Sequence, residues 1–336
     1  MTIDRFRIIG CLASFAMTAI SACTTAPPPA STAASIPALA TPPSQKPDAT
    51  EAAIGAALTL AERSRGPGQV AIWSYADEDT TVYLFGTLPF FDANANWRSP
   101  TFDRALSIAD KVVFEANTLS ATAEAQIQRT INDKGLFTDG RLLSGVLSDP
   151  VEARLRRAAA ELNIPYAALE SFKPWLVAYQ MDITAAQTSA LQSTSDIERT
   201  ITDHSNDASK SISYLTSVRE RLDALGDLPI ETQIDRLTVA AISSELGSTL
   251  SSALIQEWLD GDESGLEALT ATPLVQGGDA AYQSVIVNRN KAWLPDLKAL
   301  LEQAGTKLVI LDSAHLLGPS GVIALLEADG ISVSRE

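Results

Sequence analysis

The stretch "KLVILD" (residues 307–312) decides the fold, because four consecutive apolar residues, 308–311, predict a strand that is buried on both faces. Strands of this kind belong to parallel sheets that helices cover on both sides. The segment after it, "SAHLLGPSGVIALLEADG" (313–330), predicts a loop and a helix, and "ISVS" (331–334) predicts a final strand. The C-terminal part therefore contributes strands and helices to an α/β sheet.

Further strand signals lie at the other end of the folded part. "QVAIWSYADEDTTVYLFG" (69–86) predicts a hairpin of two strands around an acidic turn at 76–80. Gly86 then lets the backbone turn, and Pro89 ends any ladder because it has no backbone N–H. "KVVFEA" (111–116) predicts another short buried strand, which ends at Glu115.

Helical patterns fill the rest. Ser99 before Pro100 predicts the start of one helix, and Asp149 is the predicted cap of another. From about 122 to 258, apolar residues recur at helical spacing. A later helix is predicted to break near Pro295 and to be closed by Gly305.

These patterns predict an α/β (α+β) fold in one domain, residues 51–336, with a central sheet of N- and C-terminal strands and a large helical middle. The 336 residues are 46% hydrophobic and 20% charged, which is ordinary for a chain with a core. The net charge of −16 argues against nucleic acid as a partner, because Lys and Arg carry most phosphate binding. It also argues against electrostatic attachment to an anionic membrane surface.

The first 22 residues predict a lipoprotein signal peptide. Arg5 and Arg7 precede an apolar run, and small residues precede Cys23. The sequence "ISAC" (20–23) resembles the lipobox of bacterial lipoproteins, in which the cysteine is lipidated and becomes the first residue. The alternative is an ordinary cleaved signal peptide with Cys23 as a bystander. Because the other cysteine, Cys11, lies inside the signal, the mature chain would have neither a disulfide nor a catalytic thiol.

Residues 23–50 are rich in Ala, Pro, Ser and Thr and predict a disordered tether, because they cannot bury enough apolar surface to fold. The tether would join the domain to the membrane through the lipid anchor. Thr24, where many inner-membrane lipoproteins have Asp, suggests an outer-membrane anchor that faces the periplasm. An inner-membrane anchor and a secreted periplasmic protein are the alternatives.

The chain resembles the TraB/GumN family, which is related to the Tiki-type metalloproteases. The resemblance covers most of residues 70–333 and rests on "VYLFGT", "WRSP", "FEAN", "WLDGD" (258–262) and a long C-terminal block. In that block the matching positions are Tyr282, Arg289, Asn290, Trp293, His315, Leu316, Gly318 and Gly321.

Members of the family are related to metal-dependent proteases and to hydrolases that act on small molecules. The resemblance implies a sheet that brings two histidine-bearing turns together. One histidine follows the first core strand in a Gly-x-x-His turn, and the other lies in a Gly-x-x-His-Leu turn. Here the second histidine is His315 and the associated acid is Glu115, but Pro89 stands where the first histidine belongs. The turn that begins at Gly86 and Thr87 has thus lost its ligand.

Two more departures accompany this loss. The usual Gly-Ala-Gly before the second histidine is residues 312–314, Asp-Ser-Ala, and Thr216 replaces a glutamate of a central "Leu-Glu-Thr". A divalent metal would therefore need Glu115, Asp312 and His315 as ligands; no other cofactor is predicted. Asp312 has an alternative role as the cap of the following helix or as a partner of Arg289.

The remaining candidates have two interpretations each. Glu115 is a ligand, a base or the ion-pair partner of Arg289, and Arg289 is an anion clamp for a substrate carboxylate or that partner. His315 is a lone general base or a hydrogen-bonded structural residue. His204 is expected to be a solvated helix residue, Trp258 and Trp293 packing anchors, and Trp97 a loop plug.

Three functions follow from these choices. The first is a membrane-tethered envelope protein with a degenerate hydrolase site that binds a peptide, a polysaccharide or a protein partner. The second is an active metal-dependent hydrolase or protease that uses Glu115, Asp312 and His315. The third is a structural envelope lipoprotein without a ligand. Whether the chain is an enzyme depends on the site, since a fold alone does not fix function.

Overall fold

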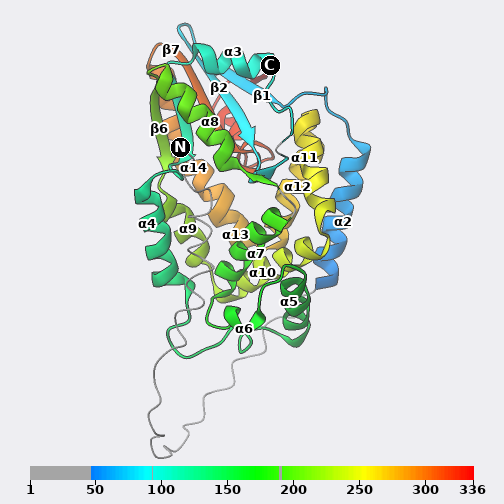
Figure 1. Ribbon diagram of the computed structural model, residues 1–336. Coiled ribbons are helices and arrows are strands. Elements are labelled where there is room, and N and C mark those ends of the chain that lie inside the picture. Colours follow the sequence, from blue (N-terminus) through cyan, green and yellow to red (C-terminus); the bar gives the residue numbers. More distant parts are fainter. Residues whose placement is uncertain (1–46, 93, 189–190) are drawn as a thin grey trace, which may run out of the picture. The chain divides into compact units, whose positions relative to one another are not determined.

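The computed structural model describes residues 47–92, 94–188 and 191–336 (Figure 1). The predicted signal peptide and Cys23 lie outside the described residues. Helix α2 (Pro47–Arg63) begins four residues before the predicted start of the domain, and the chain from there to residue 336 belongs to one compact unit. None of the described helices combines the length and the apolar character that a membrane span requires.

A six-stranded mixed sheet, in the order β6-β4-β7-β2-β1-β8, organises the unit. Strands β6, β4, β7 and β2 are parallel to one another, and β1 and β8 extend the sheet in antiparallel pairing. The strands are β1 (Ile72–Ala76), β2 (Thr80–Thr87), β4 (Lys111–Ala116), β6 (Ser211–Thr216), β7 (Gly305–Asp312) and β8 (Ser334–Arg335); β3 (Phe90–Phe91) and β5 (Gln192–Ser193) form a small separate ladder. The predicted α/β fold class is confirmed.

Strand β7 lies in the middle of the sheet because its apolar run is buried on both faces. Leu308 and Ile310 belong to one buried cluster, whereas Val309 and Leu311 belong to another. This alternation is what a strand requires when helices cover both faces of its sheet.

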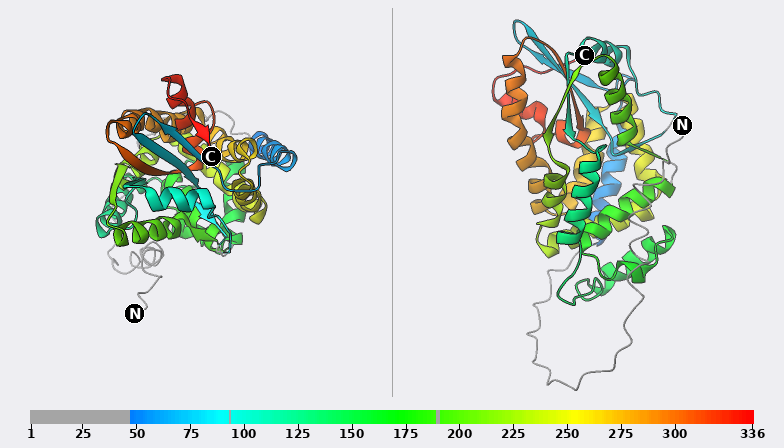
Figure 2. Two further views of the ribbon diagram at one scale, coloured as in Figure 1. Left: turned by 90° about the horizontal axis from the view of Figure 1, so that it is seen from above. Right: turned by 60° about the vertical axis from the view of Figure 1, so that its left-hand side comes forward.

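Helices α3 (Pro100–Ile108) and α8 (Thr194–Asp207) supply the first cluster, and α14 (Asn288–Ala299) and α16 (Val322–Ala328) supply the second. The right-hand view of Figure 2 shows α14 in orange and α8 in green on opposite sides of the sheet. The sheet is therefore the middle of three layers.

The carboxyl ends of the parallel strands point toward the helical middle (Figure 1). Three of its helices, α5, α7 and α10, pack around a core of their own, and α2 packs on α12. The bounds are α4 (Ala121–Thr130), α5 (Asp149–Glu161), α6 (Tyr166–Leu169), α7 (Pro174–Thr188), α9 (Val218–Gly226), α10 (Ile230–Glu245), α11 (Ser248–Asp260), α12 (Glu263–Gln276), α13 (Asp279–Tyr282) and α15 (Ser313–Leu316).

Several local predictions are confirmed. The hairpin of β1 and β2 forms, β4 spans the quoted segment "KVVFEA", and the Ser99 side chain caps α3 with Pro100 at its first position. The short ladder of β3 and β5 was not predicted, and one strand of the six-stranded sheet was missed: β6 arises from the middle that the pattern predicted as mostly helical. It lies at the edge of the sheet and is only partly buried, so its apolar signal is weak.

Four boundary predictions were wrong. Pro295 lies inside α14, at an exposed position where water can satisfy the carbonyl that loses its partner. Gly305 does not close that helix; it begins β7, with φ +108°. The residue that caps α5 is Ser148, one before Asp149, and the final strand β8 is Ser334–Arg335.

Candidate functional site

Two turns meet at the carboxyl edge of the sheet, one after β2 and one after β7. The strands pair residue by residue, with Gly86 opposite Leu311 and Thr87 opposite Asp312. A Cβ on Gly86 would lie 2.7 Å from the Ser313 Oγ, so only glycine allows this close approach. The structure thus brings the early and the late turn together.

The turn after β2 is held by its neighbours. The Trp258 indole N–H donates a 2.8 Å hydrogen bond to the Gly86 carbonyl, and the Thr87 hydroxyl donates to the Leu311 carbonyl at 3.1 Å. Pro89 is exposed, and its carbonyl accepts a 3.0 Å hydrogen bond from the backbone N–H of Thr194. This turn presents no acid, base or metal ligand between Gly86 and Pro89.

The turn after β7 carries His315, which is 3% exposed and held by Asn290. The Asn290 amide nitrogen donates to the carbonyls of His315 at 3.0 Å and of Ser320 at 2.8 Å, so its Oδ1 is the acceptor. That oxygen lies 2.7 Å from the His315 Nδ1, which therefore carries the ring proton. The Nε2 keeps its lone pair and lies 3.4 Å from the Arg289 Nη1, which donates to it.

The environment of His315 keeps its ring neutral. Burial lowers the pKa of His315 to about 3, and Arg289 and Arg221 act in the same direction against Glu115. The ring also packs against Trp293, with 4.7 Å between the centroids. An imidazole with so low a pKa is a weak general base near neutral pH.

Glu115, at the end of β4, is 6% exposed and ionised. Burial acts to raise its pKa, but Arg221, His315 and Arg289 together outweigh burial and lower the pKa of Glu115 to about 2. The Arg289 Nη2 donates to the Glu115 Oε1, and the Arg221 Nε lies 3.6 Å from the same oxygen. Two guanidinium groups therefore neutralise one buried carboxylate.

Arg289 lies between Glu115 and His315, the acid and the histidine of the family pattern. Its guanidinium contacts Glu115 through Nη2 and His315 through Nη1, and it lies 4.8 Å from the Trp293 ring centroid. Its side chain is 13% exposed. The planar guanidinium is thus fixed by an ion pair, a hydrogen bond and a cation–π contact.

Asp312 acts as the cap of the short helix α15. Its Oδ1 accepts a 2.9 Å hydrogen bond from the backbone N–H of Ala314. Burial raises the pKa of Asp312 to about 6, with the Glu115 carboxylate acting in the same direction. Of the three roles that the sequence left open for Asp312, namely metal ligand, helix cap and partner of Arg289, the geometry matches the cap.

A sequence model of the TraB/PrgY/gumN family matches residues 71–335, nearly the whole of the compact unit. The chain belongs to the TraB/PrgY/gumN family. Comparisons with curated proteins and with solved structures gave no significant match. Helix α2 precedes the part of the chain that the family model covers.

The metal chemistry associated with the TraB/PrgY/gumN resemblance does not fit the residues present. Across the described parts of the chain, no three or more His, Cys, Asp or Glu side chains are arranged to hold a metal ion. A cation, the Arg289 guanidinium, already contacts both Glu115 and His315. Asp312 is turned to the backbone of α15. No catalytic step is therefore assigned to a metal here.

Arg221 and Asn290 complete the site, and sequence reasoning assigned a role to neither. Arg221 lies on α9 directly after β6, and its side chain is 42% exposed even though it faces Glu115. A signal for its placement was available, because Ser217 and Glu220 form a capping box that marks the start of α9. Because β6 was not predicted, the start of a new helix at α9 was not recognised.

Of the other sequence candidates, Trp258 and Trp293 contact the site, through the Gly86 carbonyl and through His315 and Arg289. His204 is exposed on α8, as predicted, and Trp97 packs against Phe85 and Phe102 with centroids 5.9 and 5.1 Å away. Trp258 and Trp293 are buried, as expected for packing anchors. Thr216, which stands where the family has a glutamate, donates to the Glu220 carboxylate at 2.9 Å.

Proposed function

We propose that this TraB/PrgY/gumN chain is a cell-envelope protein, anchored through a lipid on Cys23 and facing the periplasm, that binds a ligand without hydrolysing it. The observation that carries the proposal is the contact of Arg289 with both Glu115 and His315. These two side chains are the acid and the histidine of the family pattern, and each is bound to the guanidinium. Because Pro89 replaces the first histidine, the site lacks a strong base. It keeps the charged side chains of Glu115, Arg289 and Arg221, which can bind a charged ligand.

Arg221 is the group that favours a particular ligand chemistry. Glu115 raises the pKa of Arg221, so the guanidinium stays charged. Among the described residues its Nη groups donate no hydrogen bond, and its side chain remains 42% exposed. A guanidinium whose Nη donors are unoccupied matches a carboxylate in a bidentate manner. We therefore expect an acidic group on the ligand, as at the C-terminus of a peptide or on the uronic acid of a polysaccharide.

The test measures binding of two carboxylate probes, trialanine and trigalacturonate, to the full chain by isothermal titration calorimetry. We expect at least one probe to bind and to lose roughly tenfold or more in affinity in Arg221→Gln, since a charged hydrogen bond contributes ~1.5–3 kcal/mol. Arg219→Gln is the matched control, because Arg219 lies on the same helix and pairs with Asp223. Amidated trialanine should bind more weakly than the free acid.

Hydrolysis is followed in the same samples by mass spectrometry. Cleavage of a probe by wild-type protein that is lost in His315→Ala would contradict the binding role. It would favour the second function, an active hydrolase that uses Glu115, Asp312 and His315. One equivalent of a divalent metal in purified protein, lost in the same variant, would support the metal-dependent form of that function.

The anchor is tested separately from the site. Cys23→Ala should move the protein from the membrane fraction to the soluble periplasmic fraction and abolish labelling with palmitate. Unchanged membrane attachment of the variant would contradict the lipid anchor. A wild-type chain that binds neither probe and has normal membrane attachment would leave the third function, a structural envelope lipoprotein.

A further inference from the structure

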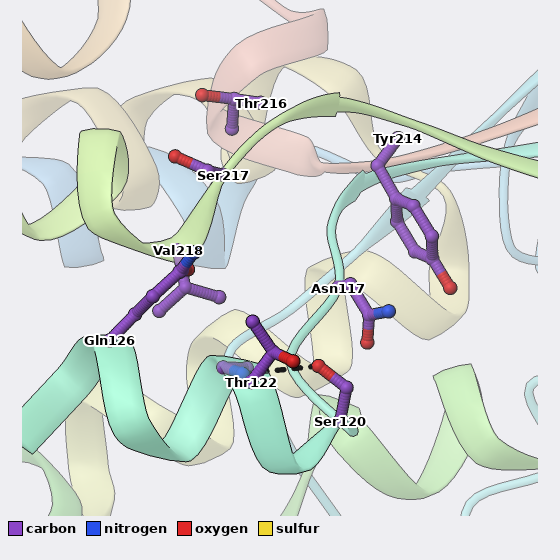
Figure 3. A pocket seen from close by; sticks show the side chains of 9 residues that line it. Asn117, Ser120, Thr122, Gln126, Tyr214, Thr216, Ser217 and Val218 are labelled. Atoms are coloured by element: carbon purple, nitrogen blue, oxygen red, sulfur yellow. Dashed lines mark hydrogen bonds between the residues drawn. The ribbon is translucent and has the colours of Figure 1, made fainter.

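Apart from the site around Glu115, a hollow lies at the carboxyl ends of β4 and β6, between the starts of α4 and α9 (Figure 3). Its volume is about 390 Å³, within the range of small-molecule sites. Tyr214 of β6 lies opposite Phe114 of β4 in register, and their rings stack with 6.1 Å between centroids. Because Phe114 and Glu115 are consecutive in one strand, they point to opposite faces of the sheet. The hollow is therefore distinct from the Glu115 site.

The lining of the hollow is polar and uncharged. Seven of its nine lining residues are Asn, Gln, Ser, Thr or Tyr, and the other two are Ala and Val, in a chain whose net charge is −16. A phosphate or carboxylate would find no Lys or Arg in this lining, and a cation would find no carboxylate. The ligand class that matches is neutral and rich in hydrogen-bonding groups.

Several of these polar groups are free to bind. Among the described residues, the Tyr214 hydroxyl, the Thr122 hydroxyl and the Gln126 amide make no hydrogen bond to the protein, and Asn117 uses only its Oδ1, as an acceptor from the Leu119 N–H at 3.3 Å. Figure 3 shows Tyr214 and Asn117 directed toward the same part of the hollow. An apolar ligand would leave these groups unpaired, which costs affinity.

The remaining polar residues of the lining make hydrogen bonds within the protein. The hydroxyls of Thr216 and Ser217 both donate to the Glu220 carboxylate, at 2.9 and 2.8 Å, and the Ser120 hydroxyl accepts from the Ala123 N–H. Burial and the nearby Glu198 carboxylate raise the pKa of Tyr214, so its phenol stays protonated and able to donate. Tyr214 as a residue is 41% exposed, and it is one of the exposed large hydrophobic residues in the described part of the chain.

We propose that this hollow binds a neutral saccharide, with a sugar ring against the exposed face of Tyr214. Sugar hydroxyls donate and accept at once, as do the amides and hydroxyls of Asn117, Thr122 and Gln126. An aromatic face packs against the C–H face of a sugar ring, and the phenol reaches a hydroxyl at its rim. The proposal does not depend on the binding of a carboxylate by Arg221, which is absent from the lining of the hollow.

The test uses saturation-transfer NMR on the full chain with three neutral probes at millimolar concentration: cellotriose, maltotriose and triacetylchitotriose. We expect transfer to at least one probe, with its affinity weakened at least tenfold in Tyr214→Ala and severalfold in Gln126→Ala. Leu142→Ala is the control, because Leu142 is a large hydrophobic side chain with a similar exposure, 51%, outside the hollow. Arg221→Gln should bind the sugar like the wild type, which separates this result from the test of the carboxylate site.

Circular dichroism shows whether the variants fold, and Gln126→Ala, a partly exposed helix substitution, keeps the test open if Tyr214→Ala does not. The proposal is overturned if no probe receives saturation, or if folded Tyr214→Ala and Gln126→Ala both bind like the wild type. It is also overturned if an uncharged Gly-Ser peptide binds and is displaced by none of the sugars, which would indicate a peptide added along the free edge of β6.

Discussion

The turn after β2 and the turn after β7 leave neighbouring parallel strands at one edge of the sheet, yet they differ in what they hold. The first turn has Pro89 exposed at its end. The second carries His315, buried and bonded to Asn290 and Arg289. The backbone pairing between the two strands is continuous up to both turns.

The comparison teaches that the backbone arrangement of the two turns can be kept while the reactive side chains of the site are lost. Gly86 still approaches Ser313 closely, and Trp258 still binds the Gly86 carbonyl, although no histidine follows. That arrangement is fixed by backbone contacts, whereas the chemistry depends on side chains at a few positions. The following predictions test each half of that statement, from the largest expected effect to the smallest.

Loss of Asn290 should damage the histidine turn most. In Asn290→Ala, the His315 N–H and the carbonyls of His315 and Ser320 lose their partner in a buried place. We expect the free energy of unfolding to fall by about 3–5 kcal/mol, since each unsatisfied buried group costs ~1–3 kcal/mol. Urea denaturation at pH 7 measures it. Asn288→Ala, an exposed change on the same helix, should stay within ~0.5 kcal/mol, and equal effects would refute the role of Asn290.

Acid should destabilise the protein through Glu115. Its pKa of about 2 in the folded state lies below the ordinary value of 4.5, so the stabilisation is present above pH 4.5 and is lost as the pH falls toward 2. The gap corresponds to roughly 3 kcal/mol. His315, with its pKa lowered to about 3 from 6.5, acts with the same sign as the pH falls from 6.5 toward 3.

Urea denaturation between pH 2 and pH 7 separates the two contributions. Glu115→Gln should flatten the profile below pH 4.5 and keep the part that comes from His315. The control is Glu124→Gln, an exposed change on α4. A Glu115→Gln profile that still falls as steeply as the wild type below pH 4.5 would show that the ion pair with Arg289 does not set the acid stability.

The close approach of the two turns is tested at Gly86. The Cβ added in Gly86→Ala would meet the Ser313 Oγ at 2.7 Å and the Leu316 Cδ1 at 3.1 Å, so we expect a loss of ~1–3 kcal/mol. Ser313→Ala should cost less than ~0.5 kcal/mol, because the buried Ser313 Oγ has no hydrogen-bond partner in the described chain. In the double variant the two changes should couple favourably by ~0.5 kcal/mol or more. Strict additivity would mean that the turns do not touch as described.

Restoring the missing histidine should have the smallest effect. Pro89 is exposed, so Pro89→His should change the free energy of unfolding by less than ~0.5 kcal/mol. Because the Arg289 guanidinium lies between Glu115 and His315, we expect no uptake of zinc, as measured by elemental analysis after dialysis. One bound equivalent of zinc in this variant would show that the other metal ligands are in place and that the Arg289 guanidinium moves away from Glu115 and His315.

The sequence predicted those parts of the fold whose signal is local. The runs that became β2, β4 and β7 are continuously apolar or nearly so, and each was placed correctly. Strand β6 was not predicted because it is a partly exposed edge strand without a continuous apolar run. The prediction at Pro295 was wrong because this residue lies at an exposed position of α14, where water can satisfy the carbonyl that loses its helical partner.

The site was predictable only in part. Glu115, Arg289 and His315 came from the family resemblance, and the structure does bring them together. The ion pairs of Glu115 with Arg289 and with Arg221 join residues more than 100 positions apart, and Arg221 also follows the missed strand. The contact of Arg289 with His315 spans 26 positions. No periodicity encodes such contacts, so they became visible only with the tertiary structure.

The eight consecutive residue pairs between β2 and β7 also bear on how freely this sheet edge can vary. A slip of one residue would turn every side chain of the strand to the wrong face, so the two separate apolar clusters on the faces of β7 lock the alignment. Substitutions downstream of the paired segment leave that alignment untouched. Pro89, which is exposed just past β2, is consequently a position where a substitution leaves the fold intact, and an inherited catalytic group can disappear there while the protein persists.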